Sequence, residues 1–143
     1  KREVLAGIHF LTAHTRTGSS AIGADTIKIA MFTNSSSIDA DTTGYTTGNE
    51  VSGTNYTAGG NTLASITIGL GDNSSSVPTI SNARGALIYN GTLTTAGTGS
   101  TTNHAAKPSI AVINFGGDKS SSAGDFTIQM PTNDANSALI RIA

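Results

Sequence analysis

The sequence contains no cysteine and no tryptophan, and only three prolines. Without cysteine the fold can have neither disulfides nor thiolate metal sites, so its stability has to come from a buried core. A chain of 143 residues can bury about two-thirds of its unfolded surface in one core. The composition therefore favours a compact domain that needs no covalent or metal cross-link.

Charge is also scarce. Charged side chains make up 12% of the chain, and the formal net charge is -1. Proteins that bind nucleic acid or anionic membranes gain affinity by neutralising phosphates with clustered Lys and Arg. No apolar run approaches the roughly 20 residues that span a bilayer as a helix. We therefore expect neither a nucleic-acid partner nor a membrane partner.

Threonine, serine, glycine and asparagine account for nearly half of the residues, a bias toward strands and turns. From Thr26 onward apolar residues recur at every second position, which is typical of strands. Six runs are predicted to be strands: 26–32, 64–70, 83–89, 109–115, 125–130 and 138–143. The run 109–115 is apolar on both faces and is interpreted as a central strand. Because turn-rich segments without a helical pattern separate the runs, we predict an all-β fold, an antiparallel β-sandwich or jelly roll.

The first fourteen residues follow a helical period instead. Val4, Leu5, Ile8 and Leu11 share one face, and "TRTGSS" follows as a breaker. A helix this short is stable only when packed, so this face is expected to contact its own sandwich or a neighbouring subunit. Residues 1–24 are thus predicted to be a helix with a linker, and residues 25–143 the β-sandwich domain. The candidate interface residues are Val4, Leu5, Ile8, Phe10 and Leu11.

The segment "DADTTGYTTGNE", residues 39–50, nearly matches an EF-hand calcium loop. Asp39 and Asp41 occupy positions 1 and 3, Gly44 position 6 and Glu50 position 12, whereas Thr43 fails position 5. An EF-hand also needs a helix on each side, and both flanks here read as strand or turn. We interpret the pattern as coincidence and predict no metal site.

Other chemical motifs are missing from the sequence. His9, His14 and His104 lack metal-ligand spacing, and no phosphate-binding loop or nucleophile elbow occurs. We predict no catalytic residues and no cofactor, and hence no enzyme activity. Four N-x-[ST] triplets start at Asn34, Asn55, Asn73 and Asn90, close to the roughly three that composition alone would give.

Several segments together resemble a family of small virion structural proteins of tailed bacteriophages, of the podovirus and cyanophage type. They are "DTIKIAMFTNSS", "EVSGTNYTAGGNTL", "ARGALIYNGT", "KPSIAVINFGGDK", "FTIQMP" and the ending "ALIRIA", within residues 25–143. The resemblance implies a capsid cement or decoration protein on the outer surface of the phage head. Its implied partners are the major capsid protein and further copies of itself, as a dimer or trimer.

The alternative is a tail- or fibre-associated domain that binds host glycans. Such a domain needs an exposed aromatic platform on which sugars stack. Only Tyr45, Tyr56 and Tyr89 are available among the tyrosines, and their turn-rich surroundings suggest that Tyr45 and Tyr56 hold their own turns.

Overall fold

The computed structural model describes residues 14–15, 21–22, 25–63, 79–97, 104–122 and 126–129. These residues form β-strands, turns and irregular segments, and no helix occurs among them. The strands are β1 (His14–Thr15), β2 (Ala21–Ile22), β3 (Ile27–Thr33), β4 (Asn61–Thr62), β5 (Ile80–Asn90) and β6 (Ser109–Ser121).

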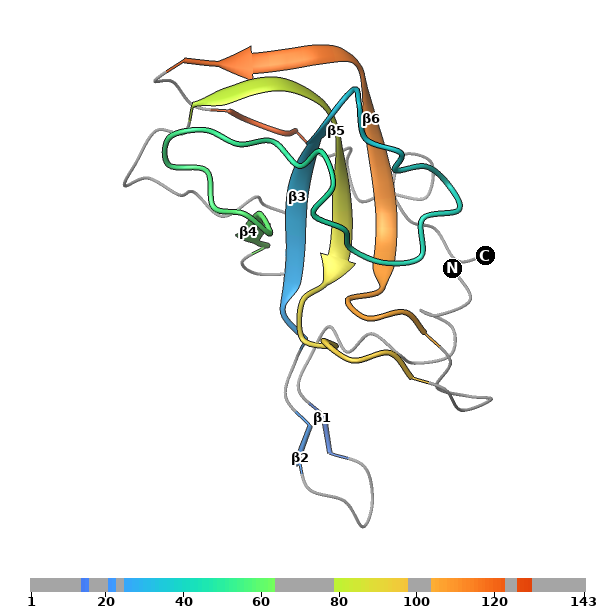
Figure 1. The fold of residues 1–143 in the computed structure, drawn as a ribbon. Coiled ribbons are helices and arrows are strands. Elements are labelled where there is room, and N and C mark those ends of the chain that lie inside the picture. Colours follow the sequence, from blue (N-terminus) through green and yellow to red (C-terminus); the bar gives the residue numbers. More distant parts are fainter. Residues whose placement is uncertain are drawn as a thin grey trace.

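One antiparallel sheet of four strands dominates the fold, in the order β4-β3-β5-β6 (Figure 1). The short strands β1 and β2 pair with each other and extend from the end of the sheet at which β3 begins. The prediction of an all-β fold is confirmed, and so is a strand at 26–32, which is β3. The sandwich or jelly roll stays a prediction.

Both faces of the sheet carry apolar side chains. Successive apolar residues of β3 and β5 point to opposite faces, and residues on the same face pack together. Ile27 and Ile29 of β3 pack with Ala86 and Ile88 of β5 on one face, where Ile128 joins them. The opposite face holds a second cluster, made by Ala30, Phe32, Leu87 and Tyr89 with Ile38, Tyr45 and Val112. The segment between β3 and β4 crosses this second face (Figure 1). Burial on both faces makes these two strands the centre of the fold.

Among the described strands, the run 109–115 lies at an edge and not at the predicted central position. Strand β5 lies between β3 and β6, and every residue from Gly85 to Asn90 is buried. Strand β6 forms the outer edge of the described sheet, and its residues 109–113 are only half-buried. An apolar run does not show whether a strand is hydrogen-bonded on one side or on both. Because β5 contains small residues, its sequence did not indicate that it is more buried than β6.

Other predictions meet the structure unevenly. The predicted helix over residues 1–14 lies outside the described residues except for its last position, His14, which belongs to strand β1. Residues 126–129 are not a strand, although Phe126 packs beside Phe115, with ring centroids 6.2 Å apart. The alternation of apolar and polar residues in this segment therefore reflects alternating burial, although the segment pairs with no strand. The predicted strands 64–70 and 138–143 lie outside the described residues.

Two consecutive glycines bring the chain back to the sheet before β4. Gly60 has a φ of +67°, and a Cβ placed on it would lie 1.8 Å from the carbonyl oxygen of Ile29. Only glycine permits this approach, because any side chain would overlap the backbone of β3. The approach sets the register in which Asn61 pairs with Ile29.

Replacing Gly60 by alanine is expected to lower the free energy of unfolding by about 3 kcal/mol or more, from backbone strain and overlap combined. Gly116 is the matched control, since its φ is +73° but a Cβ there would meet nothing within 4 Å. Gly116→Ala should cost only about 1 kcal/mol, the conformational cost alone. Urea denaturation of both variants measures the difference, and equal losses would contradict the close approach at Gly60.

Candidate functional site

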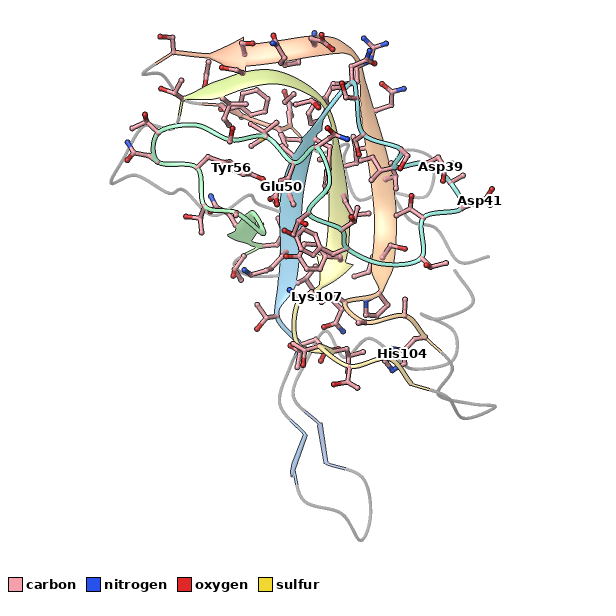
Figure 2. The ribbon with its side chains drawn as sticks, in the orientation of Figure 1. Asp39, Asp41, Glu50, Tyr56, His104 and Lys107 are labelled. Carbon is pink, nitrogen blue, oxygen red and sulfur yellow. The ribbon has the colours of Figure 1, made fainter. Side chains whose placement is uncertain are left out.

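The densest polar cluster in the described residues centres on the carboxylate of Glu50. Its Oε2 accepts a hydrogen bond from the Tyr45 hydroxyl at 2.6 Å. Its Oε1 accepts from the Tyr56 hydroxyl at 2.7 Å and from the backbone N–H of Gly59 at 2.8 Å. Figure 2 shows Glu50 and Tyr56 together beside β3. Three donors from one loop thus converge on a half-buried carboxylate, which repays its desolvation.

The backbone next to Glu50 joins this cluster to the sheet. Val51 donates its N–H to the carbonyl of Met31 at 2.9 Å, and Thr33 donates to the carbonyl of Asn49 at 3.0 Å. The Tyr56 hydroxyl also accepts a hydrogen bond from the N–H of Met31 at 3.0 Å. The loop between β3 and β4 is therefore fastened to β3 through both backbone and side chains.

The aromatic ring of Tyr45 is partly buried and contacts other rings. It stacks on Tyr89, with centroids 4.6 Å apart and an interplanar angle of 19°, and meets Phe32 edge to face. The Lys107 ammonium lies 5.0 Å from the centroid of the Tyr45 ring. Because Tyr89 occupies one face of that ring, the ammonium covers the other, in a cation–π arrangement. Tyr89 itself is buried and donates its hydroxyl to the carbonyl of Gly59 at 2.7 Å.

Burial and Glu50 keep these phenols neutral. Burial raises the pKa of Tyr56 well above its ordinary value, and the hydrogen bond to Glu50 raises it further. The pKa of Tyr45 is raised for the same two reasons. Both hydroxyls therefore act as hydrogen-bond donors, which suits a role in holding the loop and not in proton transfer at neutral pH.

The residues of the calcium-like pattern are not brought together. Asp39 accepts hydrogen bonds at Oδ1 from the N–H of Asp41 at 2.9 Å and from the Thr42 hydroxyl at 3.3 Å, which closes a local turn. In Figure 2 Asp39 and Asp41 lie on the β6 side of the view, whereas Glu50 lies beside β3. No group of three or more His, Asp and Glu side chains occurs in the described part of the chain. The residues that match the calcium-loop pattern in the sequence therefore do not form a set of metal ligands in the described structure.

A hollow of about 410 Å³ lies between this turn and the outer strand β6. Ile38, Asp39, Ala40 and Thr42 line one side, and residues of 109–114 line the other. The turn is joined to the start of β6, since Ser109 donates its N–H to the carbonyl of Thr43 at 3.0 Å and its hydroxyl to the carbonyl of Thr42. The lining of the hollow is mixed: Ile38, Ala40, Ile110, Ala111 and Val112 are aliphatic, and Asp39, Thr42, Ser109 and Asn114 are polar.

The remaining predicted residues are placed as follows. The candidate interface residues Val4, Leu5, Ile8, Phe10 and Leu11 lie outside the described residues, as do His9 and Asn73. Asn34 and Asn55 are exposed, Asn90 is fully buried, and the His104 ring lies 2.8 Å from the carbonyl of Ala105.

Sequence reasoning found the tyrosines but missed their partner. Tyr45 and Tyr56 were expected to hold their own turns, but their hydroxyls bond to Glu50, which the sequence analysis placed only in the calcium-like pattern. A signal was present, because Glu50 lies five and six residues from two tyrosines in a segment without Lys or Arg. Without a nearby Lys or Arg, a half-buried carboxylate has to accept hydrogen bonds from uncharged donors such as tyrosine hydroxyls.

Comparisons with protein-family models, with curated proteins and with solved structures gave no match. Within the described residues, no helix is long and apolar enough to cross a membrane.

Two tyrosine variants test the cluster at neutral pH. Tyr56→Phe removes hydrogen bonds to both Glu50 and Met31, whereas Tyr45→Phe removes only the one to Glu50. We expect losses of unfolding free energy of about 3 kcal/mol and about 1.5 kcal/mol, respectively. Urea denaturation measures both, and a larger loss for Tyr45→Phe would contradict the assigned geometry.

The same phenols make stability depend on alkaline pH. Their folded-state pKa lies above the unfolded value near 10, so their contribution is complete below about pH 10 and is lost as the pH rises further. The free energy of unfolding should therefore fall above about pH 10, and more gently in Tyr56→Phe. Parallel pH profiles for the two proteins would show that Tyr56 does not carry the effect.

Proposed function

We propose that this protein is a capsid cement protein of a tailed bacteriophage, bound to the outer surface of the head where it stabilises contacts between capsomers. The sequence resemblance supports this function. In the proposed assembly the chain forms a sandwich or jelly roll, binds the major capsid protein and associates with further copies of itself. It uses no catalytic residue, cofactor or metal.

The observation that carries the proposal is the outer margin of β6. Half-buried aliphatic residues from Ile110 to Ile113 lie at the outer edge of the described sheet, beside the hollow formed with the turn at Asp39. Asp39 is the only charged residue in that lining. An aliphatic strand margin next to a hollow with one charged residue fits a protein surface better than a charged ligand.

The fastened loop is a second support. Glu50 and the three tyrosines hold the segment that covers one face of the sheet, so the turn at the hollow projects from a fixed framework. A framework that is ordered before binding loses less conformational entropy when it docks. On a lattice of many contacts, even modest single contacts then give long-lived attachment.

The glycan-binding alternative receives less support from the tyrosines. Tyr45 is covered by Tyr89 on one face and by Lys107 on the other, and Tyr89 is buried. The Tyr56 hydroxyl is engaged with Glu50 and Met31. The rings of Tyr45 and Tyr89 are thus engaged within the fold, and Tyr56 is partly buried against Val51, Ile80 and Ala83, whereas a sugar platform requires free ring faces.

The proposed function predicts that heads decorated with this protein resist heat better than heads from which it has been removed, because a ligand that binds only the assembled shell stabilises it. Thermal release of DNA from both kinds of head measures this, and electron microscopy locates the copies. Equal heat resistance, or copies confined to the tail, would overturn the cement function.

A matched pair of variants tests the hollow. Ala40→Arg places a long cationic side chain at its exposed rim, and Thr62→Arg places the same charge on the exposed strand β4, at the opposite edge of the sheet. Both should melt like the parent protein, since exposed substitutions change stability by less than about 0.5 kcal/mol. Sedimentation with stripped heads should show at least about tenfold weaker binding for Ala40→Arg only, the equivalent of about 1.4 kcal/mol. Equal retention of the two variants would place the contact elsewhere.

The N-terminal segment is the second predicted contact. Each aliphatic residue of Val4, Leu5, Ile8 and Leu11 can contribute roughly 1.5–3 kcal/mol when buried against a neighbour. Deletion of residues 1–13 should leave the melting temperature of the free protein nearly unchanged and abolish retention on heads. A large fall in the melting temperature would show instead that the segment packs on its own domain.

A further inference from the structure

The turn after β5 contains a reactive sequence, Asn90–Gly91. Of the eleven asparagines in the chain, only Asn90 is followed by glycine. Because glycine has no side chain, its backbone nitrogen can reach the Cγ of a preceding asparagine with little hindrance. A bond then forms between the Gly91 nitrogen and the Asn90 Cγ, and the side-chain amide nitrogen leaves as ammonia. The product is a cyclic succinimide. Water opens that ring to aspartate or to its isomer, isoaspartate.

In the folded chain each reacting group is held away from this path. The Gly91 N–H, the attacking group, donates to the carbonyl of Thr26 at 2.7 Å. Asn90 donates its Nδ2 to Asp25 Oδ2 at 2.6 Å, and its Oδ1 accepts from the N–H of Thr92 at 2.9 Å and of Leu93 at 3.4 Å. The side chain of Asn90 is fully buried, which also excludes the water needed to open the ring.

We propose that Asn90–Gly91 is a deamidation site that folding keeps closed, and that its product cannot be accommodated by the fold. Ring closure needs rotation of the Asn90 side chain and release of the Gly91 N–H, so the turn has to open first. An aspartate at position 90 would then place a carboxylate where the amide now donates to Asp25. Two carboxylates at this distance repel each other when both are ionised. Deamidation at this site would therefore trap the turn in its opened form.

The first experiment follows deamidation in the full-length chain, folded and in urea, at mildly alkaline pH. Peptide mass spectrometry measures conversion at Asn90, and at Asn34 as an internal reference, since Asn34 precedes a serine and is exposed in the fold. Conversion of Asn90 should be at least about tenfold slower in the folded protein, because the reaction awaits local opening. Asn34 should change far less between the two conditions. Equal rates for Asn90 in the folded and unfolded chain would overturn the proposal.

Gly91→Ala is the chemical control in urea. A methyl group next to the attacking nitrogen should slow conversion of Asn90 severalfold in the unfolded chain. In the fold a Cβ at Gly91 would press on the Lys28 side chain at 3.1 Å and on the backbone carbonyl of Thr26 at 3.2 Å, but the comparison is made in urea and does not require the variant to fold. An unchanged rate in urea would show that the Asn–Gly step is not the reaction observed.

A charge swap tests the product. Asn90→Asp mimics the deamidated chain and should lower the melting temperature strongly, or leave the chain unfolded. The double variant Asp25→Asn with Asn90→Asp restores one amide opposite one carboxylate and should recover most of the loss. Wild-type melting of the single variant, or no recovery in the swap, would refute the predicted clash between the two carboxylates.

Discussion

The carboxylate of Glu50 holds the segment between β3 and β4 against the sheet. A half-buried carboxylate without partners would cost several kcal/mol of desolvation, and here three donors from the same segment offset that cost. The donors in turn depend on Glu50, because burial favours the neutral phenols and leaves their hydroxyls in need of acceptors. Loop and sheet therefore order together.

This dependence extends to both faces of the sheet. Strands β3 and β5 are apolar on each side, so a bare sheet would expose one cluster to water. The fastened segment places Ile38 and Tyr45 over one face, while Leu63 and Ile128 contribute to the other. A chain with so few charged residues needs such covers, since it has few charges with which to keep apolar surfaces from associating.

The region proposed for function differs from the regions that stabilise the fold. The polar groups around Glu50 and around Asn90 are engaged within the fold and buried in part or in full. The residues at the margin of β6 are only half-buried, and with the turn at Asp39 they line the hollow, where they remain accessible. The proposed contact surface is thus distinct from the Glu50 cluster. Asn90, in contrast, donates its backbone N–H to the carbonyl of Pro108, next to Ser109 in the lining of the hollow, so an opened turn at Asn90 would disturb that surface too.

Period-two alternation and a composition rich in turn formers determined the all-β class and placed β3 and most of β5 and β6, because side-chain alternation follows directly from strand geometry. The sequence could not rank β5 above β6, since Ala83, Gly85 and Ala86 look weakly apolar although they lie between two hydrogen-bonded neighbours. The spacing of Glu50 from Tyr45 and Tyr56 made these tyrosines candidate donors, but it could not decide between them and the calcium-like pattern with Asp39. Which strand has partners on both sides, and which donors reach a carboxylate, depend on contacts between residues distant in the chain, and only the tertiary structure decided them.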